Sequence, residues 1–194
     1  MKTFIALAIA LALLYGCAAT LNEGVSPDGR PYRGAQNAKL TIYEYSDFQC
    51  PFCDRARQNV EEVLRQYPDS VKLEYRYFPL GSHPRGFASA LAGACAEEQG
   101  KFWKMHDLMF DNQEALEDAD LEKYAQQSGM DVGAFKQCLS SVAAASKVSA
   151  DKAQGDSLGV QGTPTFFIGQ SVVVGAQPVS KFKTAIDSEL ARIG

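Results

Sequence analysis

The chain has 194 residues, 46% of them hydrophobic and 22% charged, which is the composition of one globular domain with a full core. Its net charge is −4 and it contains no run of basic residues, so nothing in these totals suggests binding to nucleic acid. The motifs along the chain therefore decide its class.

The first residues are typical of an export signal. Lys2 supplies one positive charge, and residues 4–14 form an unbroken apolar run. The run is shorter than the about 20 residues that a membrane-spanning helix needs, and small residues follow it. A buried N-terminal helix is a poorer interpretation because the run has no polar face. We therefore expect residues 1–16 to be a signal peptide and the mature protein to be extracytoplasmic.

The sequence Leu14-Tyr15-Gly16-Cys17 resembles the lipobox of bacterial lipoproteins, in which the cysteine is diacylated and becomes the new N-terminus. Tyr15 departs from the small residue preferred there, and cleavage after Ala19 is the alternative. We favour lipidation of Cys17 and a tether to a membrane. Residues 17–33 are polar and rich in turn formers without a hydrophobic period, so we interpret them as a flexible linker.

Residues 34–194 are expected to form the folded domain, an α/β unit. Hydrophobic periodicity predicts strands at 39–45, 71–78, 165–168 and 172–174, and helices at 54–66, 86–98, 102–110, 118–127, 132–139, 142–156 and 180–191. The order is βαβ, a block of helices over about 84–158, and then ββα. It predicts a split α/β domain with an all-helical insertion.

Two cysteines, Cys50 and Cys53, stand where the first predicted strand gives way to a helix, and Pro51 suits the first helical turn. The unpaired N–H groups and the dipole of that turn stabilise a thiolate. We expect Cys50 to be exposed at the helix tip and to attack a substrate disulfide. Cys53, one turn inside, then resolves the mixed disulfide. Half a zinc site is the alternative, but no second pair of ligands has the right spacing.

Two further cysteines, Cys95 and Cys138, remain in the domain when Cys17 is set aside. An even number in an exported chain suggests two pairs, with three possible connectivities. Because both lie on predicted helices of the insertion and lack another local partner, we predict a structural disulfide between them. Two buried free thiols are the alternative.

Thr163 and Pro164 stand just before a predicted strand, about 110 residues after the cysteine pair. Together with SDFQCPFC, YRYFPL, EQGKFWKMHDLMF and GVQGTPTFFIG, they resemble the DsbA-like branch of the thioredoxin superfamily. The resemblance covers about residue 38 to the C-terminus. It implies a thioredoxin fold with an all-helical insertion between its βαβ and ββα halves, and extracytoplasmic disulfide chemistry.

The resemblance also assigns site residues. Cys50 is the nucleophile and Cys53 the resolving thiol of a redox-active disulfide, and Pro164 is a cis-proline facing them. Glu44 matches the buried acid that shuttles protons near the inner cysteine. Pro51, Phe52 and Thr163 border the substrate site.

The motif leaves the redox direction open. Phe52 stands where the strongest oxidants of the family carry a histidine, and Thr163 is also found in isomerases and reductases of the superfamily. The leading hypothesis is an exported thiol–disulfide oxidoreductase. A disulfide isomerase or reductase and a chaperone-like peptide-binding module are the alternatives. The expected partners are unfolded or disulfide-containing exported proteins and a membrane redox protein that recycles the dithiol. No cofactor or metal is expected.

Overall fold

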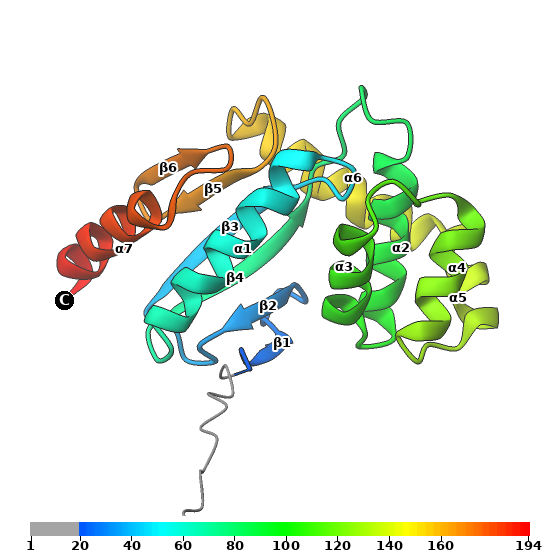
Figure 1. Cartoon of the computed structure of the whole chain (residues 1–194), viewed down its shortest axis with the longest axis horizontal. Coiled ribbons are helices and arrows are strands. Elements are labelled where there is room, and N and C mark those ends of the chain that lie inside the picture. The colour runs from blue at the N-terminus through cyan, green and yellow to red at the C-terminus, as the bar shows by residue number, and fades with distance from the viewer. Residues whose placement is uncertain (1–19) are drawn as a thin grey trace, which may run out of the picture.

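The computed structural model describes residues 20–194, so the expected signal peptide and Cys17 lie outside the described residues. A sheet of six strands forms the centre, in the order β1-β2-β4-β3-β5-β6 (Figure 1). β3 and β4 run parallel, and the other neighbours are antiparallel. The strands are β1 (Glu23–Val25), β2 (Pro31–Gly34), β3 (Leu40–Ser46), β4 (Val71–Tyr77), β5 (Thr165–Ile168) and β6 (Ser171–Val174).

The helix α1 (Pro51–Gln66) connects the parallel strands β3 and β4. Its apolar residues recur at helical spacing, and Ala56, Val60, Val63 and Leu64 are all buried on one side. Pro51 occupies the first turn, where its missing N–H breaks no helical hydrogen bond. The helix therefore begins directly after Cys50 and holds this residue at its N-terminus.

The insertion follows β4 and lies to one side of the sheet (Figure 1). It contains α2 (Gly86–Glu98), α3 (Phe102–Asp111), α4 (Asp118–Gln127), α5 (Val132–Leu139) and α6 (Val142–Ser157). Side chains cap several of these helices: Asp131 accepts a hydrogen bond from the Ala134 amide, and Ser141 one from the Ala144 amide. α6 leads back to β5. The predicted order βαβ, helical block, ββα is confirmed, with boundaries within three residues for most elements.

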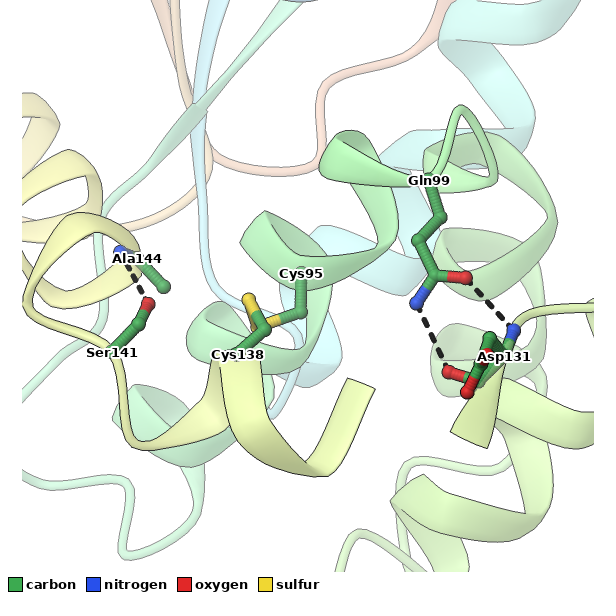
Figure 2. The surroundings of a disulfide bond; sticks show 6 residues. All are labelled: Cys95, Gln99, Asp131, Cys138, Ser141 and Ala144. Atoms are coloured by element: carbon green, nitrogen blue, oxygen red, sulfur yellow. Dashed lines mark hydrogen bonds between the residues drawn. A yellow bond between two sulfur atoms is a disulfide. The ribbon is translucent and has the colours of Figure 1, made fainter. Parts of the chain in front are cut away.

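A disulfide joins Cys95 on α2 to Cys138 on α5 within the insertion (Figure 2). Nearby, the Gln99 side chain donates to the carbonyl of Asp131 and accepts from its amide. A covalent link and a pair of hydrogen bonds therefore connect the C-terminal half of α2 to α5 and the turn before it.

The chain closes with α7 (Val179–Ile193), which packs against α1 and the β3, β5 and β6 strands. The tight β5–β6 turn places Gly169 at a φ of 57°, a left-handed conformation that glycine adopts without strain. Among residues 20–194, no helix is both long and apolar enough to cross a membrane.

The flexible linker predicted for residues 17–33 is wrong from Glu23 onward. Residues 23–25 and 31–34 pair as an antiparallel hairpin, and β2 extends the sheet beside β4. Gly29 in the turn has a φ of 77°, and Ser26 and Arg30 exchange backbone and side-chain hydrogen bonds. Arg33 explains how so polar a segment docks, because its buried guanidinium pairs with Glu23, Glu61 and Asp107.

Candidate active site

The two cysteines of the CxxC motif lie at the N-terminus of α1 as free thiols. Cys50 is the N-cap residue, and its backbone carbonyl accepts hydrogen bonds from the amides of Cys53 and Asp54 at 3.0 and 3.4 Å. Cys53 follows inside the first turn. The sequence thus places one sulfur at the helix tip and the other against the sheet, as a proline-started helix after a strand requires.

The environment drives the pKa values of the two thiols apart. A hydrogen bond from the Cys53 thiol is the largest effect on Cys50, and with help from Thr163 and the amides of Cys53 and Phe52 it outweighs burial and lowers the pKa of Cys50 to about 5. Burial, reinforced by the neighbouring Cys50, raises the pKa of Cys53 well above its usual value. Near neutral pH the pair therefore holds a thiolate on Cys50 and a proton on Cys53.

Cys50 is covered in the structure, and the expectation of an exposed thiol at the helix tip is wrong. The residue is 3% exposed and Cys53 is 0% exposed. In its protonated form, the Cys50 thiol donates to the carbonyl oxygen of Thr163 at 3.3 Å. The Thr163–Pro164 peptide bond is cis, and this segment lies just before β5. Cover thus comes from a segment far away in the sequence.

Glu44 lies on β3 beneath the cysteine-bearing helix and is 3% exposed. Burial is the largest effect on its carboxyl group and raises its pKa to about 7, although Ser46 and Arg57 act in the opposite direction. Glu44 is directly opposite Tyr75 in the parallel register of β3 and β4. A carboxyl group with this pKa exchanges its proton near neutral pH, which suits an acid–base group.

Pro51 and Phe52 form the exposed rim of the site. Phe52 is 51% exposed, and the Arg55 guanidinium carbon lies 4.3 Å from the centre of its ring. This places an apolar surface two residues from Cys50.

Several residues that sequence reasoning missed hold the loop before Cys50. The buried Asp47 carboxylate accepts from the amides of Gln49 and Leu80 and faces Nδ1 of His83 at 2.8 Å. The Gln113 side chain, from the helical insertion, donates to the carbonyls of Phe48 and Cys50 at 2.8 and 3.0 Å. The insertion is therefore bound to the active-site loop. The only signal in the sequence was the place of Asp47 inside the conspicuous SDFQC segment.

Ser46 and Tyr75 were also missed. Both side chains are buried next to Glu44, and neither hydroxyl has a hydrogen-bond partner within residues 20–194. Strand alternation places Ser46 on the same face as Glu44, but the partner strand's register was needed to locate Tyr75. In the same part of the chain, no group of three or more His, Cys, Asp and Glu side chains is arranged to hold a metal ion.

Comparisons with known proteins place this geometry in context. The family profile described as Thioredoxin matches residues 26–188. A thioredoxin-like oxidoreductase from Silicibacter pomeroyi superimposes with a TM-score of 0.78 at 24% identity, over 86% of this chain and 94% of that one. A periplasmic thioredoxin-like protein from Salmonella enterica gives a TM-score of 0.70 at 22% identity, over 84% and 91% of the two chains. The thiol-disulfide exchange protein alpha-DsbA2 from Wolbachia pipientis gives 0.74 at 19% identity, over 82% and 87%. The predicted thioredoxin fold with a helical insertion is confirmed.

The curated relatives are named as Na(+)/H(+) antiporters and not as thioredoxin-like proteins. The chain is 37% identical over 168 residues to the Na(+)/H(+) antiporter NhaA 3 of Salinispora tropica, which covers 86% of this chain but 26% of the antiporter. An NhaA antiporter of Herminiimonas arsenicoxydans is 36% identical over 76% of this chain and 24% of its own length. The chain thus spans about a quarter of these relatives, so the similarity concerns one segment of each.

Proposed function

Because this chain belongs to the thioredoxin family, we propose that it is a DsbA-like oxidoreductase that catalyses thiol–disulfide exchange in exported proteins through Cys50 and Cys53. The observation that carries the proposal is the difference in pKa between the two thiols. Cys50 has a pKa of about 5 at the tip of α1, and Cys53 behind it keeps its proton. A pure peptide-binding module has no use for such a pair.

The exchange runs in two steps. A substrate thiolate attacks the Cys50 sulfur of the Cys50–Cys53 disulfide, a mixed disulfide forms, and Cys53 leaves with the electron pair and takes a proton. A second substrate thiolate then attacks the substrate sulfur of the mixed disulfide, and Cys50 leaves as a thiolate. The substrate gains a disulfide and the enzyme is reduced by two electrons. The reverse sequence reduces a substrate disulfide.

The direction we propose is oxidation of the substrate. Stabilising the Cys50 thiolate stabilises the reduced enzyme relative to its disulfide, since the thiolate exists only in the reduced form. A lowered pKa of Cys50 therefore makes the enzyme a stronger oxidant. A membrane redox partner must then restore the disulfide.

The exposed Phe52 ring and the Thr163–Pro164 segment border the proposed substrate site. Because the Cys50 sulfur is buried and contacts the Thr163 carbonyl, a substrate must approach along this border. An extended, unfolded segment with an apolar side chain next to its cysteine fits that surface.

We further propose that the protein is extracytoplasmic and tethered by lipid on Cys17. The charged start, the short apolar run and the lipobox-like Leu14-Tyr15-Gly16-Cys17 support this, and the Salmonella enterica relative is described as periplasmic. Mass spectrometry of the native N-terminus should find acylated Cys17. An unmodified chain beginning at Thr20 would refute the anchor.

The decisive experiment compares wild type with Cys50→Ala in the oxidation of a reduced, unfolded protein and in insulin reduction. Wild type is expected to be active in the first assay, Cys50→Ala inactive in both, and Cys53→Ala to accumulate mixed disulfides with the substrate. A chaperone-like module predicts instead that Cys50→Ala still suppresses aggregation as wild type does and that neither protein exchanges disulfides.

A further inference from the structure

Two buried hydroxyl groups lie beside the Glu44 carboxyl group. Ser46 follows Glu44 by two residues on β3, so both side chains point to the same face of the sheet. Tyr75 is directly opposite Glu44 on β4. Ser46 is 1% exposed and Tyr75 0% exposed, and neither hydroxyl is hydrogen-bonded to any of the described residues. Unpaired buried polar groups are rare in folded proteins, and they often have a catalytic role.

Ser46 is the side chain that the inner cysteine and the acid have in common. Burial is the largest effect on the pKa of Cys53 and raises it. The side chains that also act on this pKa are Cys50, which raises it, and Ser46, which lowers it. Burial is likewise the largest effect on the pKa of Glu44 and raises it, and the side chains of Ser46 and Arg57 lower it. The Ser46 hydroxyl lies close enough to act on both groups but forms no hydrogen bond with either in this resting state. Catalytic hydrogen bonds are often long at rest and shorten in the reacting complex.

We propose that Ser46 is a proton-relay residue that carries the proton between the Cys53 thiol and the Glu44 carboxylate. The proposal rests on the function proposed above and adds a residue to that site. A hydroxyl group donates and accepts at the same time, which a relay requires.

The relay acts when Cys53 attacks a mixed disulfide. The Cys53–Cys50 bond forms, the bond between Cys50 and the substrate sulfur breaks, and the substrate leaves as a thiolate. The Cys53 proton passes to the Ser46 oxygen, while the Ser46 proton passes to Glu44. In the oxidising direction, Cys53 is the leaving thiolate and receives its proton from Glu44 along the same path.

Several other charged and titratable groups face Glu44 and form the electrostatic surroundings of this transfer without carrying the proton. The charge of Arg57 on α1 lowers the pKa of Glu44, and the charge of Glu44 raises the pKa of Tyr75 on β4. Glu44 also lines a narrow cavity, whose other titratable side chains are Arg33 of β2, Arg57 and Glu61 of α1, and His106 of α3. Any pH profile of the site must be compared with a variant that lacks only the relay.

The test uses the reduced protein and a symmetric aromatic disulfide that releases a coloured thiol at each step. The first release reports the attack by Cys50, and the second reports resolution by Cys53. Ser46→Ala should leave the first rate unchanged and slow the second by about tenfold to a hundredfold, the lower range of acid–base catalysis. The second rate should also lose its inflection near the pH set by Glu44. Ser46→Thr keeps the hydroxyl and should restore both.

A double variant separates a relay from a structural effect. If Ser46 acts through Glu44, Ser46→Ala should add nothing to the slowing caused by Glu44→Gln. Tyr75→Phe removes the other unpaired hydroxyl and serves as the matched control, with little expected change in resolution. Because the Ser46 hydroxyl is unpaired, Ser46→Ala should unfold at the same midpoint as wild type. An unchanged midpoint excludes misfolding as the cause of slower resolution.

Three results would each overturn the relay. Ser46→Ala could release the second thiol at the wild-type rate and keep the pH inflection, or the Ser46→Ala and Glu44→Gln effects on this rate could multiply in the double variant. Tyr75→Phe could also slow the second release while Ser46→Ala does not. Failure of the proposed function looks different, because wild type would then oxidise no reduced, unfolded protein, whatever its rates with the aromatic disulfide.

Discussion

The Cys50 thiol donates a hydrogen bond to the carbonyl oxygen of Thr163, and 113 residues separate the two in the sequence. This contact joins the N-terminus of α1 to the segment that precedes β5. It covers the sulfur in the dithiol form, and it places the buried, unpaired Thr163 hydroxyl near the reacting atom. One residue thus limits access to the nucleophile and also influences its charge.

Replacing Thr163 should change the acidity of Cys50. The Cys53 thiol is the main cause of the lowered pKa, and Thr163 adds to it against the effect of burial. Thr163→Val keeps the shape of the side chain and removes the hydroxyl, so the pKa of Cys50 should rise from about 5. Thr163→Ser keeps the hydroxyl and should stay near wild type. Ultraviolet absorbance of the thiolate against pH measures both. Equal pKa values in Val and Ser variants would contradict the assignment.

Alkylation should distinguish the two thiols. With its pKa lowered to about 5, Cys50 is ionised near pH 6, whereas the raised pKa of Cys53 keeps that thiol protonated. Iodoacetamide should therefore label Cys50 first, and peptide mapping identifies the site. Cys50→Ser should remove the fast phase. Faster labelling of Cys53 would reverse the roles of the two residues.

Glu44→Gln should stabilise the reduced protein in a pH-dependent way. Burial raises the pKa of Glu44 from 4.5 to about 7, so the fold binds this proton more tightly than the unfolded chain does. The resulting stability is complete below pH 4.5 and is lost as the pH rises through about 7. The neutral glutamine loses nothing. The variant should therefore gain on wild type by up to about 3 kcal/mol across this window.

Urea unfolding at a series of pH values measures this gain. Glu62→Gln is the matched control, because Glu62 is an exposed glutamate on α1. Its difference from wild type should stay nearly constant with pH. A constant difference for Glu44→Gln would show that Glu44 titrates normally.

Removing the Cys95–Cys138 disulfide should destabilise the insertion without stopping the chemistry. The bond closes a loop with a sequence separation of 43, and such bonds typically contribute about 2–4 kcal/mol. Cys95→Ser with Cys138→Ser should lower the free energy of unfolding by that amount. Cys50 should keep its alkylation profile, since the disulfide lies away from the α1 N-terminus. Thiol counting in denaturant, on protein that lacks Cys17 and has its Cys50–Cys53 pair oxidised, checks the wild-type bond: no free thiol is expected, and two free thiols would exclude it.

Most of the fold was predictable because local patterns agree with it. The helix over 54–66 and the helices of the insertion follow apolar spacing, and the β5–β6 pair follows two short β-branched runs around Gly169. The β1–β2 hairpin was missed because its burial comes from Arg33 ion pairs, not from an apolar stripe. The Asp28-Gly29 pair in its turn is a strong hairpin signal and was present in the sequence.

The site was predictable only as far as the motif reaches. Cys50, Cys53 and Pro164 are visible from spacing and resemblance. The cover over Cys50 was not, because it depends on a contact across 113 residues. Gln113 and Tyr75 were also invisible, since the first reaches the loop from the insertion and the second depends on strand register.

The hairpin has a geometric consequence for a lipid-anchored enzyme. A linker over residues 17–33 would let the domain range about 55–60 Å from its anchor, at about 3.3–3.6 Å per residue. If Cys17 carries lipid, the stretch from Cys17 to the start of β1 at Glu23 can span at most about 20 Å. Thr20 lies in the same surface hollow as Arg65, which belongs to the last turn of α1, whereas Cys50 precedes the first turn of this helix. A domain held on so short a leash would turn Cys50 away from the lipid, toward proteins arriving from the aqueous side.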